Sequence, residues 1–203
     1  MKKSRLIVLM ILGFSLSFTS CDPPAVEALV EEGAVAKKVA VLVDEGFHDG
    51  EAFMPIGYLT NRGAKVTVIG PEKGIVKAYN SDFTIKIQKS ISDVSVDDFD
   101  ALILPGGRAP ALLRENEKVV EFTKAFFESG KITAAICHGP QVLVKAGVLE
   151  GLKSTSFAGI QKEMEAAGAL FRDTSVVVDG NLITSRIPVD LNDFCKNIEK
   201  ALF

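Results

Sequence analysis

An apolar run that stops at a cysteine is the feature that most constrains the fold of this chain. Residues 132–136 are apolar or β-branched, Cys137 follows them, and Gly139 and Pro140 then open a helical pattern. A buried strand that turns sharply into a helix at a nucleophilic side chain is typical of the elbow in α/β enzymes. Small residues two positions before and after the cysteine leave room for the tight turn. The stretch therefore predicts a strand, a turn that presents Cys137, and a helix.

Cys137 has a functional and a structural interpretation. At the first turn of a helix, backbone N–H groups and the helix dipole favour the thiolate, which is the reactive form of cysteine. On this interpretation Cys137 is a catalytic nucleophile, and its thiol pKa should lie well below the free value of about 8.5. A buried structural cysteine is the alternative, because free cysteine is among the residue types most often buried. The local pattern leaves both open.

Composition and charge narrow the class of protein. The chain has 203 residues, of which 47% are hydrophobic and 24% charged, enough for one sizeable globular domain. Its formal charge is -3, and subtracting the three positive charges of Lys2, Lys3 and Arg5 gives -6. Nucleic acid is therefore not an expected partner. With two histidines and no HExxH or CxxC motif, the chain has little with which to build a metal site, and we expect none.

The first residues have the pattern of an export signal. A basic start is followed by an apolar stretch over residues 6–18 and by small residues at 19–20, which predicts a signal peptide over residues 1–20. The stretch is too short for a comfortable membrane span. Residues 18–21, Phe-Thr-Ser-Cys, resemble the lipobox of bacterial lipoproteins, although Phe18 stands where leucine is usual. That resemblance implies that Cys21 carries the lipid. An ordinary cleaved signal and an uncleaved anchor are the alternatives.

Residues 21–36 have the composition of a spacer. Residues 21–36 contain Pro23, Pro24 and several acidic residues, which is typical of a tether between a membrane and a folded domain. We therefore expect a lipid-anchored protein of the cell envelope, facing the periplasm or the cell surface. The folded domain would then occupy residues 37–203.

From residue 37 onward, strand and helix patterns alternate. Residues 38–43 are a continuous apolar run of the kind that is buried on both faces of a parallel sheet. Further strands are expected at 65–69, 101–104 and 132–136, hairpins at 75–89 and 175–184, and helices at 50–62, 117–127, 140–146, 159–167 and from 189. The last helix places Cys195 on its apolar face, and so in the core. The order predicts one doubly wound α/β domain, with its site at the carboxyl ends of the strands.

Four motifs in this order resemble the DJ-1/PfpI family, particularly its PfpI-type branch. They are Asp-Glu-Gly-Phe-x-Asp-x-Glu at 44–51, Leu-Pro-Gly-Gly-Arg-Ala-Pro at 104–110, Ala-Ile-Cys-His-Gly-Pro at 135–140, and Ser-Arg-x-Pro-x-Asp-Leu at 185–191. The resemblance implies a flavodoxin-like sandwich, also called a class I glutamine amidotransferase-like fold. It also implies a homodimer or a larger homo-oligomer, and a reactive cysteine beside a glutamate.

The resemblance assigns roles to particular residues. Cys137 matches the nucleophile, Glu51 the glutamate that touches it, and His138 the histidine that follows it. Gly107 and His138 match the positions whose backbone N–H groups form an oxyanion hole, and Gly106 belongs to the same substrate-binding turn. Burial beside a thiolate would raise the pKa of Glu51 and allow it to exchange protons near neutral pH. The alternative for Glu51 is an exposed glutamate in a first helical turn. The alternative for residues 105–107 is a plain turn that ends a strand.

Two positions depart from the family pattern. Ala111 stands where proposals for PfpI-type peptidases place an acidic residue that a neighbouring subunit supplies to orient the histidine. Without that orienter, peptidase activity is in doubt. His48 stands where PfpI-type relatives commonly carry an acid; it could assist proton transfer or be a solvated loop histidine.

Together these features predict an enzyme that uses a cysteine nucleophile and no cofactor. The resemblance implies that it acts on small reactive carbonyls or on glycated protein, as a glyoxalase or deglycase. A cysteine peptidase of the PfpI type is the first alternative. From other classes come a redox sensor, in which Cys137 is oxidised to a sulfinic acid, and a holdase chaperone.

Overall fold

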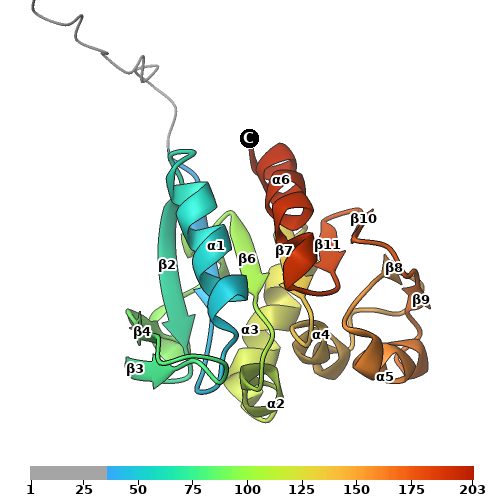
Figure 1. Ribbon diagram of the computed structural model, residues 1–203, viewed down its shortest axis with the longest axis horizontal. Coiled ribbons are helices and arrows are strands. Elements are labelled where there is room, and N and C mark those ends of the chain that lie inside the picture. The colour runs from blue at the N-terminus through green and yellow to red at the C-terminus, as the bar shows by residue number, and fades with distance from the viewer. Residues whose placement is uncertain (1–35) are drawn as a thin grey trace, which may run out of the picture. The chain divides into compact units, whose positions relative to one another are not determined.

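The computed structural model describes residues 36–203, which form a seven-stranded sheet with helices on both faces (Figure 1). The predicted signal peptide, Cys21 and all but the last residue of the tether lie outside the described residues. The strand order is β10-β11-β7-β6-β1-β2-β5, and every pairing is parallel except that of β10 with β11. The strands are β1 Lys38–Leu42, β2 Lys65–Gly70, β5 Lys89–Ser90, β6 Ala101–Leu104, β7 Ile132–Ile136, β10 Val176–Asp179 and β11 Leu182–Ser185.

The centre of the sheet is buried on both faces, as its unbroken apolar runs predict. In β1, residues 39–42 are fully buried, and in β6 all four residues are buried. Val39 of β1 is level with Val66 of β2 on one side and with Ala101 of β6 on the other. An alternating pattern would have left one face to solvent, so the run itself selects a covered parallel sheet.

The helices pack in two layers. α1 (Asp49–Thr60) lies against α6 (Leu191–Leu202) on one face, and α3 (Glu117–Glu128) lies against α4 (Pro140–Ala146) on the other (Figure 1). The amphipathic final helix is confirmed, with a buried face of Leu191, Phe194, Cys195, Ile198 and Leu202. The doubly wound α/β fold predicted from the sequence is therefore the fold observed.

Several short elements extend the predicted set. The expected hairpin at 75–89 is β3 (Gly74–Lys77) with β4 (Thr84–Ile87). The helix expected at 159–167 is α5 (Gln161–Ala166), which begins two residues later than expected. The sequence patterns did not indicate the parallel pair β8 (Lys153–Ser154) and β9 (Leu170–Phe171), or the short helix α2 (Ala109–Leu113). Four 3₁₀ turns complete the described part of the chain: Ile91–Asp93, Val96–Asp98, Ala158–Ile160 and Pro188–Asp190. Two-residue strands and single turns are too short to show a period.

This topology brings three loops together. β1, β6 and β7 are neighbours in the sheet and run parallel, so their carboxyl ends share one edge. The segments that follow these ends place Glu51 in the first turn of α1, Gly106 in the turn after β6, and Cys137 directly after β7. Within residues 36–203, no helix is both long enough and apolar enough to cross a membrane.

Candidate active site

Cys137 occupies a strained turn. Its φ is 62°, and it is the one residue other than glycine with a positive φ in the described part of the chain. The turn is held from two sides, because the Cys137 amide donates to the Ser185 carbonyl at 3.1 Å and the Cys137 carbonyl accepts from the Phe157 amide at 3.0 Å. A Cβ at Gly139 would lie 2.1 Å from the Leu104 carbonyl oxygen, so only glycine fits there. Strain of this kind is stored where function requires a side chain to be presented.

Glu51 is fully buried in the first turn of α1, directed at Cys137. Its Oε2 accepts a hydrogen bond of 2.8 Å from the Gly106 amide, and the Cys137 side chain lies beside the carboxylate. Oε1 has no hydrogen-bond partner among residues 36–203. Burial raises the pKa of Glu51 to about 7, against the opposing effects of the Gly106 amide and the Cys137 thiol. The interpretation of Glu51 as an exposed first-turn residue is therefore wrong, and the group can exchange protons near neutral pH.

The expected low pKa of the Cys137 thiol is contradicted. Burial, and then the negative charge of Glu51, raise its pKa to about 12. The backbone amides of Gly107 and His138 do point at the sulfur and favour the thiolate, but burial and the like charge outweigh them. The thiol is thus the favoured form of Cys137, and Glu51 is a neighbouring carboxylate able to receive its proton.

His138 lies on the other side of the sulfur. Its Nδ1 is 3.3 Å from Sγ of Cys137, and its ring packs on Phe157 with the centroids 4.9 Å apart and a tilt of 32°. Burial lowers the pKa of His138, and the charge of Glu163 partly opposes this. The imidazole is therefore neutral at pH 7 and able to accept a proton.

The Pro-Gly-Gly turn after β6 brings backbone close to the sulfur. Gly107 has a φ of 87°, and a Cβ there would lie 2.6 Å from both the Gly46 carbonyl oxygen and the His48 amide nitrogen. A Cβ at Gly106 would lie 2.6 Å from Oε2 of Glu51. Both positions therefore need glycine. The amides of Gly107 and His138 that point at the sulfur could also stabilise an oxygen on the carbon it attacks, and donors of this kind contribute about 2.7–4 kcal/mol each to a transition state.

The mouth of the site includes side chains that the sequence did not single out. The guanidinium of Arg108 lies over the Tyr79 ring, 5.3 Å from its centroid. Burial raises the pKa of Tyr79, as does its nearness to Cys137 and Glu51. Arg108 belongs to the Arg-Ala-Pro motif and could have been noticed there, whereas nothing in the hairpin sequence marks Tyr79.

His48 is also part of the mouth. Its ring packs edge-on against Tyr79 at 5.7 Å, and its Nδ1 is 3.4 Å from Oδ1 of Asp49. The side chain is 14% exposed, so the interpretation as a solvated loop histidine is wrong. Burial lowers the pKa of His48, although the charge of Asp49 opposes this. His48 is therefore an uncharged residue beside the site at pH 7.

The Ser-Arg-x-Pro-x-Asp motif stabilises the turn at Cys137. Arg186 forms ion pairs of 2.9 Å with Asp190 and 2.7 Å with Asp173. Its neighbour Ser185, at the end of β11, accepts the amide of Cys137. The Arg186 guanidinium is therefore paired with two protein carboxylates. The motif stabilises the turn at Cys137 without contacting the Cys137 sulfur.

Within residues 36–203, no three His, Cys, Asp or Glu side chains are grouped closely enough to hold a metal ion. What the site does contain is a strained cysteine with a buried acid on one side of its sulfur and a histidine on the other. That is the arrangement of an enzyme with a cysteine nucleophile.

The family profile that matches this chain is that of the DJ-1/PfpI family, over residues 37–201, and the protein belongs to that family. Deglycase TK1284 of Thermococcus kodakarensis is 43% identical over 165 residues, which are 81% of this chain and 99% of the relative. Protein/nucleic acid deglycase 2 of Escherichia coli is 43% identical over 170 residues, 83% of this chain and 99% of the relative. The crystal structure of Drosophila melanogaster DJ-1beta has a TM-score of 0.77 at 33% identity, covering 83% of this chain and 91% of that one.

Proposed function

We propose that the protein removes reactive carbonyl compounds, or the adducts they form on proteins, by thiol chemistry at Cys137. The observation that carries this proposal is the buried Glu51, whose pKa of about 7 suits it to take the thiol proton and return it. The similarity to proteins named deglycases supports the same substrate class.

For a dicarbonyl substrate, Sγ of Cys137 attacks the aldehyde carbon while the thiol proton moves to Glu51. The aldehyde oxygen gains the negative charge and is stabilised by the Gly107 and His138 amides. Glu51 or His138 then moves the hydrogen of that carbon, as a proton, to the neighbouring carbonyl carbon, which leaves a thioester. Water hydrolyses the thioester to a hydroxy acid and restores the thiol. No cofactor enters, since the electrons stay within the substrate.

A glycated amine reaches the same intermediate. In a hemiaminal the attacked carbon already carries the amine nitrogen, so Sγ displaces the amine while Glu51 or His138 delivers a proton to it. The free amine leaves, and the remaining hemithioacetal follows the path above. One site thus serves both free carbonyls and protein adducts.

A substrate panel tests the proposal. Wild type and Cys137→Ser are each given methylglyoxal, a freshly glycated peptide and casein. We expect hydroxy acid from the first two with wild type and none with the variant. Casein cleavage alone would instead indicate the peptidase alternative. A holdase would act equally in both proteins, and a redox sensor would turn over none of the three.

We also propose that the protein is exported and anchored in a membrane of the cell envelope through a lipid on Cys21. The basic, apolar and small-residue order of residues 1–20 supports this, as does the likeness of residues 18–21 to a lipobox. A single acyl chain binds membranes only marginally, whereas bacterial lipoproteins carry more than one. Fractionation should find the mature protein in membranes, and a Cys21→Ser variant released from them. Full-length, unmodified wild type in the cytosol would refute the anchor.

Self-association is proposed as well. Exposed apolar side chains gather where α1 meets the β3–β4 hairpin: Phe53, Met54, Ile75 and Phe83, with exposures of 38%, 38%, 72% and 62%. The rings of Phe53 and Phe83 are in edge contact with their centroids 6.0 Å apart, and exposed apolar side chains of this kind are what subunit interfaces cover. Light scattering should give a dimer or larger, and Phe83→Glu should shift it towards monomer. A monomeric wild type would refute the proposal.

A further inference from the structure

Three lysines surround a small pocket at the edge of the sheet opposite Cys137. Lys38 and Lys89 begin β1 and β5, and Lys65 begins β2, which lies between them. Lys38 is level with Lys65 at the amino ends of β1 and β2, which is the upper edge in Figure 1, from which β2 runs downward. Lys89 is level with Ile69, further along β2, and lines the pocket from there. The pocket has a volume of about 150 Å³ and is completed by Thr67, Asp98 and Phe99. Lys38 and Lys65 stand at the amino ends of β1 and β2, and Asp98 and Phe99 directly precede β6, so the lysine pocket lies towards the end of the sheet away from Cys137.

The three positive charges are not neutralised by the acids nearby. Asp98 caps a 3₁₀ turn, where its carboxylate accepts the Ser95 amide at 2.9 Å. Asp100 accepts the backbone amide of Lys38 at 2.8 Å rather than its ammonium group. Among residues 36–203, none of the three lysine ammonium groups forms an ion pair. The next lysine along this edge, Lys131, is by contrast paired with Asp97 at 3.6 Å.

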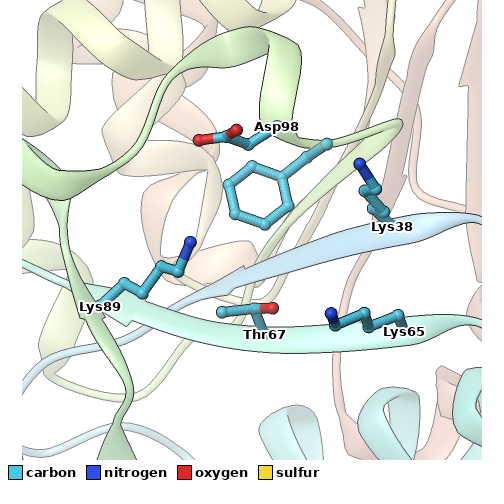
Figure 2. A pocket seen from close by; sticks show the side chains of 6 residues that line it. Lys38, Lys65, Thr67, Lys89 and Asp98 are labelled. Atoms are coloured by element: carbon cyan, nitrogen blue, oxygen red, sulfur yellow. The ribbon is translucent and has the colours of Figure 1, made fainter.

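The three lysines approach the pocket from different sides. Figure 2 shows the ammonium ends of Lys38 and Lys89 on two sides of the pocket, and Lys65 extended along β2 in the direction of Thr67. Three lysines and a threonine hydroxyl thus line one pocket, and a phosphate group carries anionic oxygens, which lysine binds as a point charge. Positive charges around one pocket favour an anion within it.

The place of this pocket in the chain indicates the source of the phosphate. Lys38 stands only two residues after residue 36, where the described domain begins, so the pocket lies where the proposed tether joins the domain. A domain held by such a tether presents this edge to the bilayer, and lysines near an anionic bilayer surface are attracted to it.

We propose that the lysine pocket binds the phosphate of an anionic phospholipid and docks the domain on the membrane, with its Cys137 edge turned away. The proposal rests on the proposed anchor only for how the domain reaches the bilayer. The affinity of the pocket for the lipid is a property of the domain itself. Docking in this orientation leaves the catalytic mouth open to soluble carbonyls and to glycated protein.

Vesicle co-sedimentation of residues 36–203 tests this without the anchor. The relatives above consist almost entirely of the matching region, since it covers 99% of the length of two of them, so the domain is a folding unit by itself. Phosphatidylcholine vesicles with and without phosphatidylglycerol are compared at low and high salt. The test variant is Lys38→Gln/Lys65→Gln/Lys89→Gln. The matched control, Lys86→Gln/Lys145→Gln/Lys162→Gln, removes the same charge from exposed positions elsewhere.

We expect binding only to the vesicles with phosphatidylglycerol, weakened by salt and by inorganic phosphate. Each lysine at an anionic surface contributes about fivefold, so the test variant should bind on the order of a hundredfold more weakly while the control stays within about tenfold of wild type. The three single variants, each weaker than wild type, guard against misfolding of the triple variant.

Three results would overturn the proposal. They are an absence of binding to phosphatidylglycerol, equal binding by the test and control variants, and binding of inorganic phosphate without binding of vesicles. Methylglyoxal turnover, measured on the same proteins, should be unchanged in both triple variants. A failure of docking is thereby separated from a failure of the proposed function.

Discussion

The carboxylate of Glu51 and the side chain of Cys137 lie side by side in one buried site, although one belongs to the first helix and the other to the turn after β7. The charge of Glu51 raises the pKa of the thiol, whereas the thiol lowers the pKa of Glu51 against the larger effect of burial. The proposed mechanism uses this neighbour relationship: Glu51 takes the thiol proton when a substrate carbon is available to the sulfur.

The shifted pKa of Glu51 predicts a pH-dependent cost in stability. The folded pKa of about 7 is above the ordinary 4.5, so the folded state binds more protons than the unfolded state between these values. The favourable contribution is complete below pH 4.5 and is lost as pH rises through 7. Relative to Glu51→Gln, wild type should lose about 3 kcal/mol of unfolding free energy between pH 4 and pH 8. Urea denaturation at several pH values measures this.

The control for that experiment is Glu165→Gln, which alters an exposed carboxylate on α5. Its difference from wild type should not change with pH. If Glu51→Gln tracks wild type at every pH, the carboxyl is not buried as described.

Labelling distinguishes the two cysteines of the domain. Cys195 is fully buried in α6, where burial raises its pKa to about 12, and it has no carboxylate beside it. Cys137 is 8% exposed and has Glu51 to take its proton. Iodoacetamide should therefore label Cys137 alone in the native state, and slowly. Peptide mapping by mass spectrometry provides the readout, with Cys137→Ser as the unlabelled control. Equal labelling of both cysteines would contradict the account.

The fit of Gly139 predicts a large difference between two glycine substitutions. Gly139→Ala places a Cβ 2.1 Å from the Leu104 carbonyl oxygen, so the elbow must shift. We expect a loss of more than about 3 kcal/mol in stability, as is usual when backbone blocks a new atom. Gly57→Ala, in α1 with open space around it, should gain about 1 kcal/mol. Thermal unfolding compares them; similar melting temperatures would show that the turn is looser than described.

Ala111 predicts weak peptidase activity. Amide cleavage has to protonate a poor leaving group, so its acid and base must be held firmly, and loss of an orienting carboxylate costs on the order of 10⁴ in turnover in a Ser-His-Asp triad. Addition of a thiol to an aldehyde has no such leaving group. Ala111→Glu should raise casein cleavage and leave methylglyoxal turnover nearly unchanged. Efficient casein cleavage by wild type, unaffected by the substitution, would contradict this argument.

Most of the fold could be predicted because it depends on long, unbroken patterns. The apolar runs at 38–43 and 132–136 indicated covered parallel strands, and the apolar face at Leu191, Phe194 and Ile198 indicated the last helix. The short pair β8 and β9 could not be predicted, because two-residue strands depend on tertiary contacts and carry no period of their own.

The site was harder to predict because the pKa of Cys137 depends on opposing effects of its surroundings. The helix dipole near Cys137 suggested a lowered thiol pKa, but burial of the thiol, and then the charge of Glu51, raised it instead. Burial of a polar first-turn residue cannot be inferred from local sequence. Likewise, Tyr79 meets Arg108 only because the β3–β4 hairpin folds over the turn after β6, through the bridges of Phe47 to Ala78 and to Gly107.

The pH dependence of methylglyoxal turnover tests the central claim most directly. If Glu51 must be ionised to take the thiol proton, kcat/KM of wild type should rise about tenfold per pH unit below pH 7 and level off above it. Glu51→Gln should be at least about 10²-fold slower and lack that rise. A Glu51→Gln enzyme as fast as wild type, or a wild-type rate that keeps rising steadily to pH 9 as thiolate forms in solution, would show that Glu51 is not the proton acceptor for Cys137.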